Sequence, residues 1–121
     1  MRLILLPDIL AICRLAPDED LPAWAMQSSS FFAVTRTADE LSIVCSDAVV
    51  PVGTRCERPW KALKIVGPLD FSLVGILAPL VTALAQAGIS IFAVSTFDTD
   101  YILVKEEQAA HAIEVLQNMS P

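Results

Sequence analysis

A segment near the middle of the chain is repeated near its end, and this repeat constrains the fold more than any other feature. Phe32–Val44 aligns with Phe92–Val104 at a constant offset of 60 residues in a chain of 121. Both copies predict a strand, a polar turn and a second strand, because acidic and hydroxyl residues separate two apolar runs. The offset is about half of the chain and predicts two related modules, residues 1–59 and 60–121.

The second module gives the clearer pattern. Trp60–Val66 alternates as a strand does, and apolar residues spaced by three and four then predict a helix over residues 73–85. Ser72 is a natural N-cap for this helix, and Gly88 stands where a left-handed C-cap glycine belongs. Two more strands follow at residues 89–96 and 101–104, and the Glu106-Glu107 pair opens a last helix whose inner stripe is Ala109, Ala112, Ile113 and Leu116.

The first module repeats this β-α-β-β-α order less clearly. Ile9–Leu15 predicts a strand, Leu21–Ser28 a short helix, and Phe31–Thr37 with Leu41–Cys45 a hairpin. The second helix is expected to be missing, because Asp47–Pro59 contains two prolines and a glycine and predicts a loop with at most one helical turn. The sequence thus predicts an α+β protein with two ferredoxin-like modules in tandem, each an antiparallel sheet with helices on one face.

Composition excludes several classes of partner. Hydrophobic residues make up 55% of the chain and charged residues 18%, which favours apolar surface covered by a second copy, most simply in a homodimer. A net charge of −6 without Lys/Arg clusters argues against nucleic-acid or anionic-membrane binding. No apolar run approaches the about 18 residues of a membrane-spanning helix, and the start of the chain predicts a first strand rather than a signal peptide.

Catalytic and metal-binding patterns are weak. Cys13, Cys45 and Cys56 are widely spaced without a Cys-x-x-Cys pair, which predicts reduced thiols packed in the strands of a cytoplasmic protein. His111 has no cysteine or aspartate near it in the sequence, and the acidic cluster at residues 18–20 is typical of a solvated loop. We therefore predict no catalytic residue, no metal and no cofactor.

The segment from Val66 to Ile91 predicts a strand, a tight loop, a helix and a second strand. A loop that feeds a helix N-terminus offers unpaired backbone N–H groups and the positive end of the helix dipole. Such a loop suits a small anionic group, for example the carboxylate of an amino acid. The loop at residues 67–73 is therefore the first candidate binding site.

These residues resemble a known family. Gly75-Ile76, followed by Ala-Gly-Ile-Ser-Ile at residues 87–91, resembles the signature of the ACT domain. Ser95–Glu106 resembles the small tandem ACT proteins of bacteria and is similar to a segment of the CASTOR-type arginine sensors; aspartokinase regulatory domains belong to the same group. The resemblance is strong over residues 60–116 and weaker over residues 9–46. It implies a sensor of small molecules, usually amino acids.

By that resemblance, ligand contacts come from the loop before the helix, from its first residues and from the turn after residue 94: Asp70, Phe71, Ser72, Leu73, Gly75, Ile76, Ser95, Thr96, Phe97 and Asp98. Amides after Asp70 and Ser72 bind a carboxylate in this hypothesis. Asp70, Asp98 or Asp100 pairs with an ammonium or guanidinium group. The structural alternative is that Asp70 and Ser72 only cap the helix and that the later aspartates only shape a hairpin.

The interpretation favoured is a cytoplasmic, non-enzymatic sensor that binds an amino acid or related metabolite. One alternative is a protein–protein interaction module that binds no ligand and forms a homodimer or docks on a metabolic enzyme. A small enzyme on a ferredoxin-like scaffold is favoured least, because the sequence shows neither a paired base and nucleophile nor a set of metal ligands.

Overall fold

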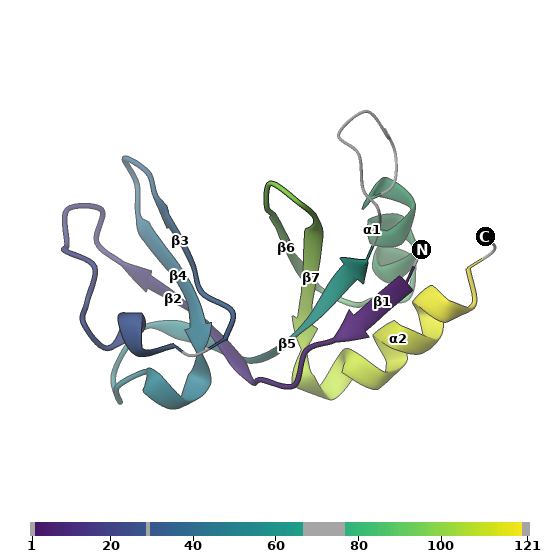
Figure 1. Ribbon diagram of the computed structural model, residues 1–121, viewed down its shortest axis with the longest axis horizontal. Helices are drawn as coiled ribbons and strands as arrows, with labels where there is room; N and C mark the ends of the chain where they lie inside the picture. The colour runs from purple at the N-terminus through teal and green to yellow at the C-terminus, as the bar shows by residue number, and fades with distance from the viewer. Residues whose placement is uncertain (1, 29, 67–76, 120–121) are drawn as a thin grey trace. The chain divides into compact units, whose positions relative to one another are not determined.

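The structure, a computed structural model, describes residues 2–28, 30–66 and 77–119. Its strands, α-helices and short 3-10 helices (η) follow one another along the chain in this order: β1 (Arg2–Leu5), β2 (Leu10–Leu15), η1 (Ala25–Gln27), β3 (Ala33–Arg36), β4 (Leu41–Ser46), η2 (Asp47–Val49), β5 (Cys56–Val66), α1 (Leu77–Gln86), β6 (Ile91–Ser95), β7 (Asp100–Lys105), η3 (Glu106–Gln108) and α2 (Ala109–Gln117) (Figure 1). The predicted α+β class is confirmed.

The chain divides into two compact units. We call Met1–Pro7 together with Lys61–Pro121 the helical unit, and Asp8–Trp60 the cysteine unit, since the latter holds all three cysteines. The 11-residue strand β5 contributes its second half to the helical unit and its first half to the cysteine unit.

The helical unit contains an antiparallel sheet in the order β1-β5-β7-β6. Figure 1 shows β5 between β7 and β1. Leu3 of β1 lies opposite Ile65 of β5, and Ile91 of β6 lies opposite Val104 of β7. β1 comes from the other end of the sequence, yet it supplies the strand that completes this ferredoxin-like sheet.

The core of the helical unit lies between the two α-helices and one face of this sheet. Side chains of β5 and β7 at alternate positions meet those of α1 and α2 and of Ile89, which follows α1. The buried residues of this core are Leu63, Ile65, Leu80, Leu84, Ile89, Ile102, Val104, Ala109, Ala112 and Leu116. Strands put alternate residues on one face and helices put every third or fourth residue there, so both periodicities in the sequence serve this one interface. The predicted inner stripe of the last helix is confirmed.

The C-terminal end of α1 has the predicted glycine cap. Gly88 has a φ of 75°, and the Ile89 N–H donates to the Leu84 carbonyl at 3.0 Å. This six-to-one hydrogen bond and the buried contact of Ile89 with Leu84 define a Schellman motif. The predicted N-cap, Ser72, lies outside the described residues.

The cysteine unit contains the antiparallel order β3-β4-β2 followed by the first half of β5. Its core lies on one face: Ala11, Cys13, Ala25, Leu41, Ile43, Cys45 and Val50. The loop predicted over Asp47–Pro59 contains the single turn η2 as expected, but it is shorter than predicted, because Cys56–Pro59 belong to β5. The helix predicted over Leu21–Ser28 is wrong, because only the three-residue η1 forms there. The predicted stretch has only eight residues, which are too few to offset the cost of nucleating an α-helix.

β5 begins at Cys56, four residues before the strand predicted from Trp60. The prediction failed because Pro59 reads as a strand breaker. In the structure the register changes from Ile12↔Glu57 to Leu10↔Trp60, so two residues of β5 lie opposite Ala11. Pro59 is one of these two, and a bulge is a position where a strand tolerates a missing N–H donor.

The two hairpins correspond, but at an offset that differs by one residue from the prediction. Arg36 lies opposite Leu41, and Ser95 lies opposite Asp100, so the structural offset is 59 and not 60. A shift of one residue moves each side chain to the other face of a sheet. At the structural offset, the buried Ile43 corresponds to the buried Ile102, as two cores on matching faces require.

The two units share the run strand-helix-strand-strand-helix, which is β5-α1-β6-β7-α2 in the helical unit and β2-η1-β3-β4-η2 in the cysteine unit, with short 3-10 helices in place of both α-helices. The fourth strand follows this run in the cysteine unit, as the first half of β5, but comes from the start of the chain in the helical unit, as β1. The sequence modules 1–59 and 60–121 remain a proposal about the repeat. In the structure, β1 belongs with the helical unit and β5 extends through both units.

The role of β1 leads to a stability prediction. Leu3 is half-buried and packs against the core of the helical unit, so Leu3→Ala should lower the free energy of unfolding by about 2 kcal/mol. Ile4→Ala is the matched control, because Ile4 is 41% exposed and should change stability by less than about 0.5 kcal/mol. Urea denaturation followed by circular dichroism measures both, and equal losses would contradict the role given to β1.

Candidate functional site

The turn between β6 and β7 holds the described part of the predicted ligand site. Ser95 ends β6, and its hydroxyl donates to Asp100 Oδ1 at 2.5 Å. The Thr96 N–H and hydroxyl both donate to the Thr99 carbonyl, at 2.8 and 3.1 Å. Phe97, at the tip, is 84% exposed, and Asp98 is exposed beside it. The turn is thus held by its own hydroxyl groups and presents Phe97 and Asp98 to solvent.

The same turn is hydrogen-bonded to the end of β5. The Thr99 hydroxyl donates to the carbonyl of Ile65, which is followed by Val66, the last residue of β5. In the sequence, Val66 leads directly into the predicted binding loop at residues 67–73. One hydrogen bond therefore brings the turn to the point where the chain enters that loop.

Six of the predicted ligand residues lie outside the described residues: Asp70, Phe71, Ser72, Leu73, Gly75 and Ile76. Their roles stay predictions. Among the remaining predicted residues, the Ser95 and Thr96 hydroxyls already make hydrogen bonds within the hairpin. The bond from Ser95 gives Asp100 the hairpin-shaping contact of the structural alternative. Phe97 and Asp98 are exposed at the tip of the turn.

In the cysteine unit, two arginine side chains occupy the corresponding place. There the loop after β2 lies beside the β3–β4 turn, and Arg36 crosses between them. Its guanidinium donates to the Pro17 carbonyl and, at 2.8 Å, to the Glu19 carbonyl, while Arg14 donates to the Asp39 carbonyl at 3.0 Å. Arginine side chains of the protein thus satisfy the backbone acceptors of this loop and turn.

At the structural offset of 59, Ser95 stands where the cysteine unit has Arg36. A serine is much shorter than an arginine and cannot reach across from a strand to a neighbouring loop. The two units therefore differ at this position in a simple way: one carries its own guanidinium, and the other carries a hydroxyl that bonds to Asp100.

A second cluster was not foreseen from the sequence. Cys13 on β2 lies between Cys45 on β4 and Cys56 on β5, and a hydrogen bond between the Cys13 and Cys45 thiols is the main influence on the pKa of both. The bond with Cys45, and then burial, raise the pKa of Cys13, and the same bond lowers the pKa of Cys45. All three cysteines lie in or against one core. The sequence could have indicated the cluster only through the alternation of each strand, which puts each cysteine on the inward face of the sheet.

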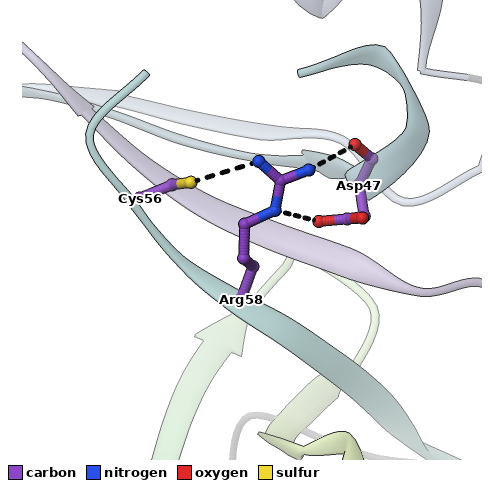
Figure 2. A network of polar contacts seen from close by, with 3 residues as sticks. All are labelled: Asp47, Cys56 and Arg58. Atoms are coloured by element: carbon purple, nitrogen blue, oxygen red, sulfur yellow. Dashed lines mark hydrogen bonds and ion pairs between the residues drawn. The ribbon is translucent and has the colours of Figure 1, made fainter. Parts of the chain in front are cut away.

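An arginine and a carboxylate border this cluster (Figure 2). Arg58 Nη1 lies 3.6 Å from Cys56 Sγ, while Nε donates to Asp47 Oδ1 at 2.5 Å and Nη2 to the Asp47 carbonyl at 3.1 Å. The hydrogen bond to Asp47 raises the pKa of Arg58, so the guanidinium stays charged. Within residues 2–28, 30–66 and 77–119, no group of three cysteine, histidine or acidic side chains could hold a metal ion.

None of the described helices is both long enough and apolar enough to span a membrane.

Family comparisons match both parts of the chain. A family model described as the ACT domain matches residues 55–118, and a second model, described as an N-terminal domain, matches residues 8–53. The first match begins with β5 and ends at α2, so it covers the elements that carry the candidate site.

Individual proteins are similar to the chain over different lengths. The human protein named Cytosolic arginine sensor for mTORC1 subunit 1 is 44% identical over 59 residues, which cover 48% of this chain and only 18% of that protein. A crystal structure of a protein from Agobacterium tumefaciens is 39% identical with a TM-score of 0.88, covering 96% of this chain and 86% of that one. The aspartate kinase regulatory subunit of Thermus thermophilus has the same fold, at 18% identity and a TM-score of 0.66, with 99% of each chain covered.

The link between the turn and β5 gives a second prediction. Thr99→Val keeps the side-chain shape but removes the hydroxyl that donates to Ile65, so it should lower the free energy of unfolding by about 1 kcal/mol. Amide hydrogen exchange should also become faster in residues 96–99. Thr35→Val, at an exposed position of β3, is the control and should leave both quantities nearly unchanged. Unchanged exchange in the Thr99 variant would show that this bond does not hold the turn.

Proposed function

Because the chain belongs to the ACT domain family, we propose that it is a regulatory protein that binds an amino acid or a related small metabolite through the helical unit. The observation that carries this proposal is the hydrogen bond from the Thr99 hydroxyl, in the Ser95–Asp100 turn, to the carbonyl of Ile65. Ile65 lies two residues before the predicted binding loop. The proposed role is binding and not catalysis.

The proposed site combines the loop and the turn. Backbone amides after Asp70 and Ser72 bind the carboxylate of the ligand, and Gly75 allows its backbone to approach closely. Phe71, Leu73 and Ile76 supply apolar contacts. On the other side, the exposed Asp98 pairs with a positively charged group of the ligand, beside Ser95, Thr96 and Phe97.

Arginine is the first ligand to test. The human relative carries the name of an arginine sensor, and Asp98 and Asp100 in the turn are suited to a guanidinium group. The cysteine unit supports the same choice, since the guanidinium of Arg36 binds two carbonyls of the corresponding loop. We therefore propose one ligand site per chain, in the unit that has Ser95 at that position.

Binding regulates only if the ligand has different affinities for two arrangements of the protein or of its partner. A homodimer in the cytoplasm is the proposed context, in which the ligand favours one arrangement of the assembly. The alternative is an interaction module without a ligand, and the 84% exposed Phe97 is the observation in its favour, because an exposed aromatic side chain also suits a protein interface.

Thermal shift with all twenty amino acids tests the proposal. At about a hundred times its dissociation constant, a ligand stabilises the native state by roughly 2.7 kcal/mol, which raises the melting temperature by several degrees. We expect arginine to give a selective shift, and we expect Asp98→Asn and Asp70→Ala to weaken it, as measured by isothermal titration calorimetry.

Asp39→Asn is the matched control, because Asp39 is an exposed acid in the corresponding turn of the cysteine unit. It should bind as the unmodified protein does. A shift with a different amino acid would keep the sensor proposal and change the ligand. No shift with any compound, together with a dimer that Phe97→Ser disrupts in light scattering, would support the interaction module instead.

A further inference from the structure

The three cysteines lie side by side on three neighbouring strands of the cysteine unit. The strand order β4-β2-β5 puts Cys13 in the middle, with Cys45 on one side and Cys56 on the other. Cys13 and Cys45 are buried, whereas Cys56 is half-buried. We propose that Cys56 is a reversible oxidation site, at which a hydroperoxide converts Cys56 and Cys13 into a disulfide.

The register of β2 and β5 suits this bond. Cys13 and Cys56 are direct partners, and the neighbouring Arg14 N–H donates to the Arg55 carbonyl at 3.0 Å. Since hydrogen-bonded and non-hydrogen-bonded pairs alternate along antiparallel strands, Cys13 and Cys56 occupy a non-hydrogen-bonded pair. Such pairs have Cα atoms about 4.5 Å apart, within the range of about 4.4 to 6.8 Å that a disulfide spans.

The other two pairings do not fit. Cys45 lies opposite Ala11, so Cys13 and Cys45 are diagonal neighbours, whose Cα atoms are about 7–8 Å apart. Cys45 and Cys56 lie on strands separated by β2, at about 10 Å. Both separations exceed what a disulfide spans without movement of the backbone.

Cys56 is the thiol that meets the oxidant. It is the one of the three that is not buried, and Arg58 Nη1 lies 3.6 Å from its sulfur. A guanidinium next to the reacting atoms stabilises the negative charge that develops as the sulfur attacks the peroxide. Asp47 holds this guanidinium through Nε and Nη2, as Figure 2 shows. Cys13 is placed for the second step by its position, because it is the direct cross-strand partner of Cys56.

The chemistry balances with the hydroperoxide as oxidant. The Cys56 sulfur attacks one peroxide oxygen, the O–O bond breaks, and a sulfenic acid forms with release of water when the peroxide is hydrogen peroxide. The Cys13 sulfur then attacks the Cys56 sulfur, the S–O bond breaks, and the Cys13 proton leaves with the hydroxyl group as a second water. Two thiols lose two electrons in total, and one peroxide gains them.

Peptide mapping of the full chain tests the pairing. After treatment with hydrogen peroxide and alkylation of free thiols, mass spectrometry without reduction should find one disulfide, Cys13–Cys56, with Cys45 alkylated. Dithiothreitol should reverse it. Cys45→Ser should keep the disulfide, and Cys56→Ser should abolish it while retaining the circular dichroism spectrum of the folded protein. A Cys13–Cys45 disulfide, or no disulfide, would overturn the proposal.

The role of Arg58 is tested by the rate of oxidation. Arg58→Gln should slow the loss of the Cys56 thiol by about fivefold, the factor expected from one charge near 4 Å in a water-exposed site. Arg55→Gln removes an exposed arginine next to Cys56 in the sequence and should leave the rate unchanged. If both variants slowed oxidation equally, the loss of one positive charge from the protein would explain the slower rate. That result would overturn the specific role of Arg58. Neither result depends on ligand binding in the helical unit.

Discussion

The pairing of β5 with strands from two distant parts of the sequence is the interaction on which the rest of the structure depends. Its first half pairs with β2 and completes the sheet of the cysteine unit, and its second half pairs with β1 and begins the sheet of the helical unit. Each unit therefore obtains a ferredoxin-like sheet only because one strand is long enough for both. The bulge opposite Ala11 allows Pro59 to lie inside that strand without a central hydrogen bond being lost.

Much of this architecture could be predicted from periodicity. Alternating and helical patterns identified β2, β4, α2 and the cap at Gly88, because these residues bury one face each. The contribution of β1 to the helical unit could not be predicted, since pairing between distant segments leaves no local signal. The start of β5 at Cys56 was also missed, because a proline at position 59 is typical of a loop and not of a central strand. The predicted offset between the two hairpins was wrong by one residue, because an alignment of similar residue types does not show which face of the sheet a side chain occupies.

The candidate site could be predicted only as segments of chain. Ser95–Asp98 was proposed from resemblance, but the hydrogen bond of this turn to Ile65 is made by the Thr99 hydroxyl, which was not among the predicted ligand residues. The cysteine cluster was invisible for the same reason, because its members lie 32 and 11 positions apart in sequence and meet only through the order β4-β2-β5. Local patterns specify elements, whereas sites of this kind are specified by pairing.

The two proposed sites use the two ends of one strand. Cys56 is the first residue of β5, and Ile65, which accepts the hydrogen bond from Thr99, is its last but one. Strand β5 is therefore a physical connection by which oxidation and ligand binding could affect each other, provided that each favours a different arrangement of it. Such coupling is reciprocal: if the disulfide changes ligand affinity by some factor, the ligand changes the equilibrium of disulfide formation by the same factor. The position of β5 in both sheets thus allows this reciprocity to be tested from either proposed site.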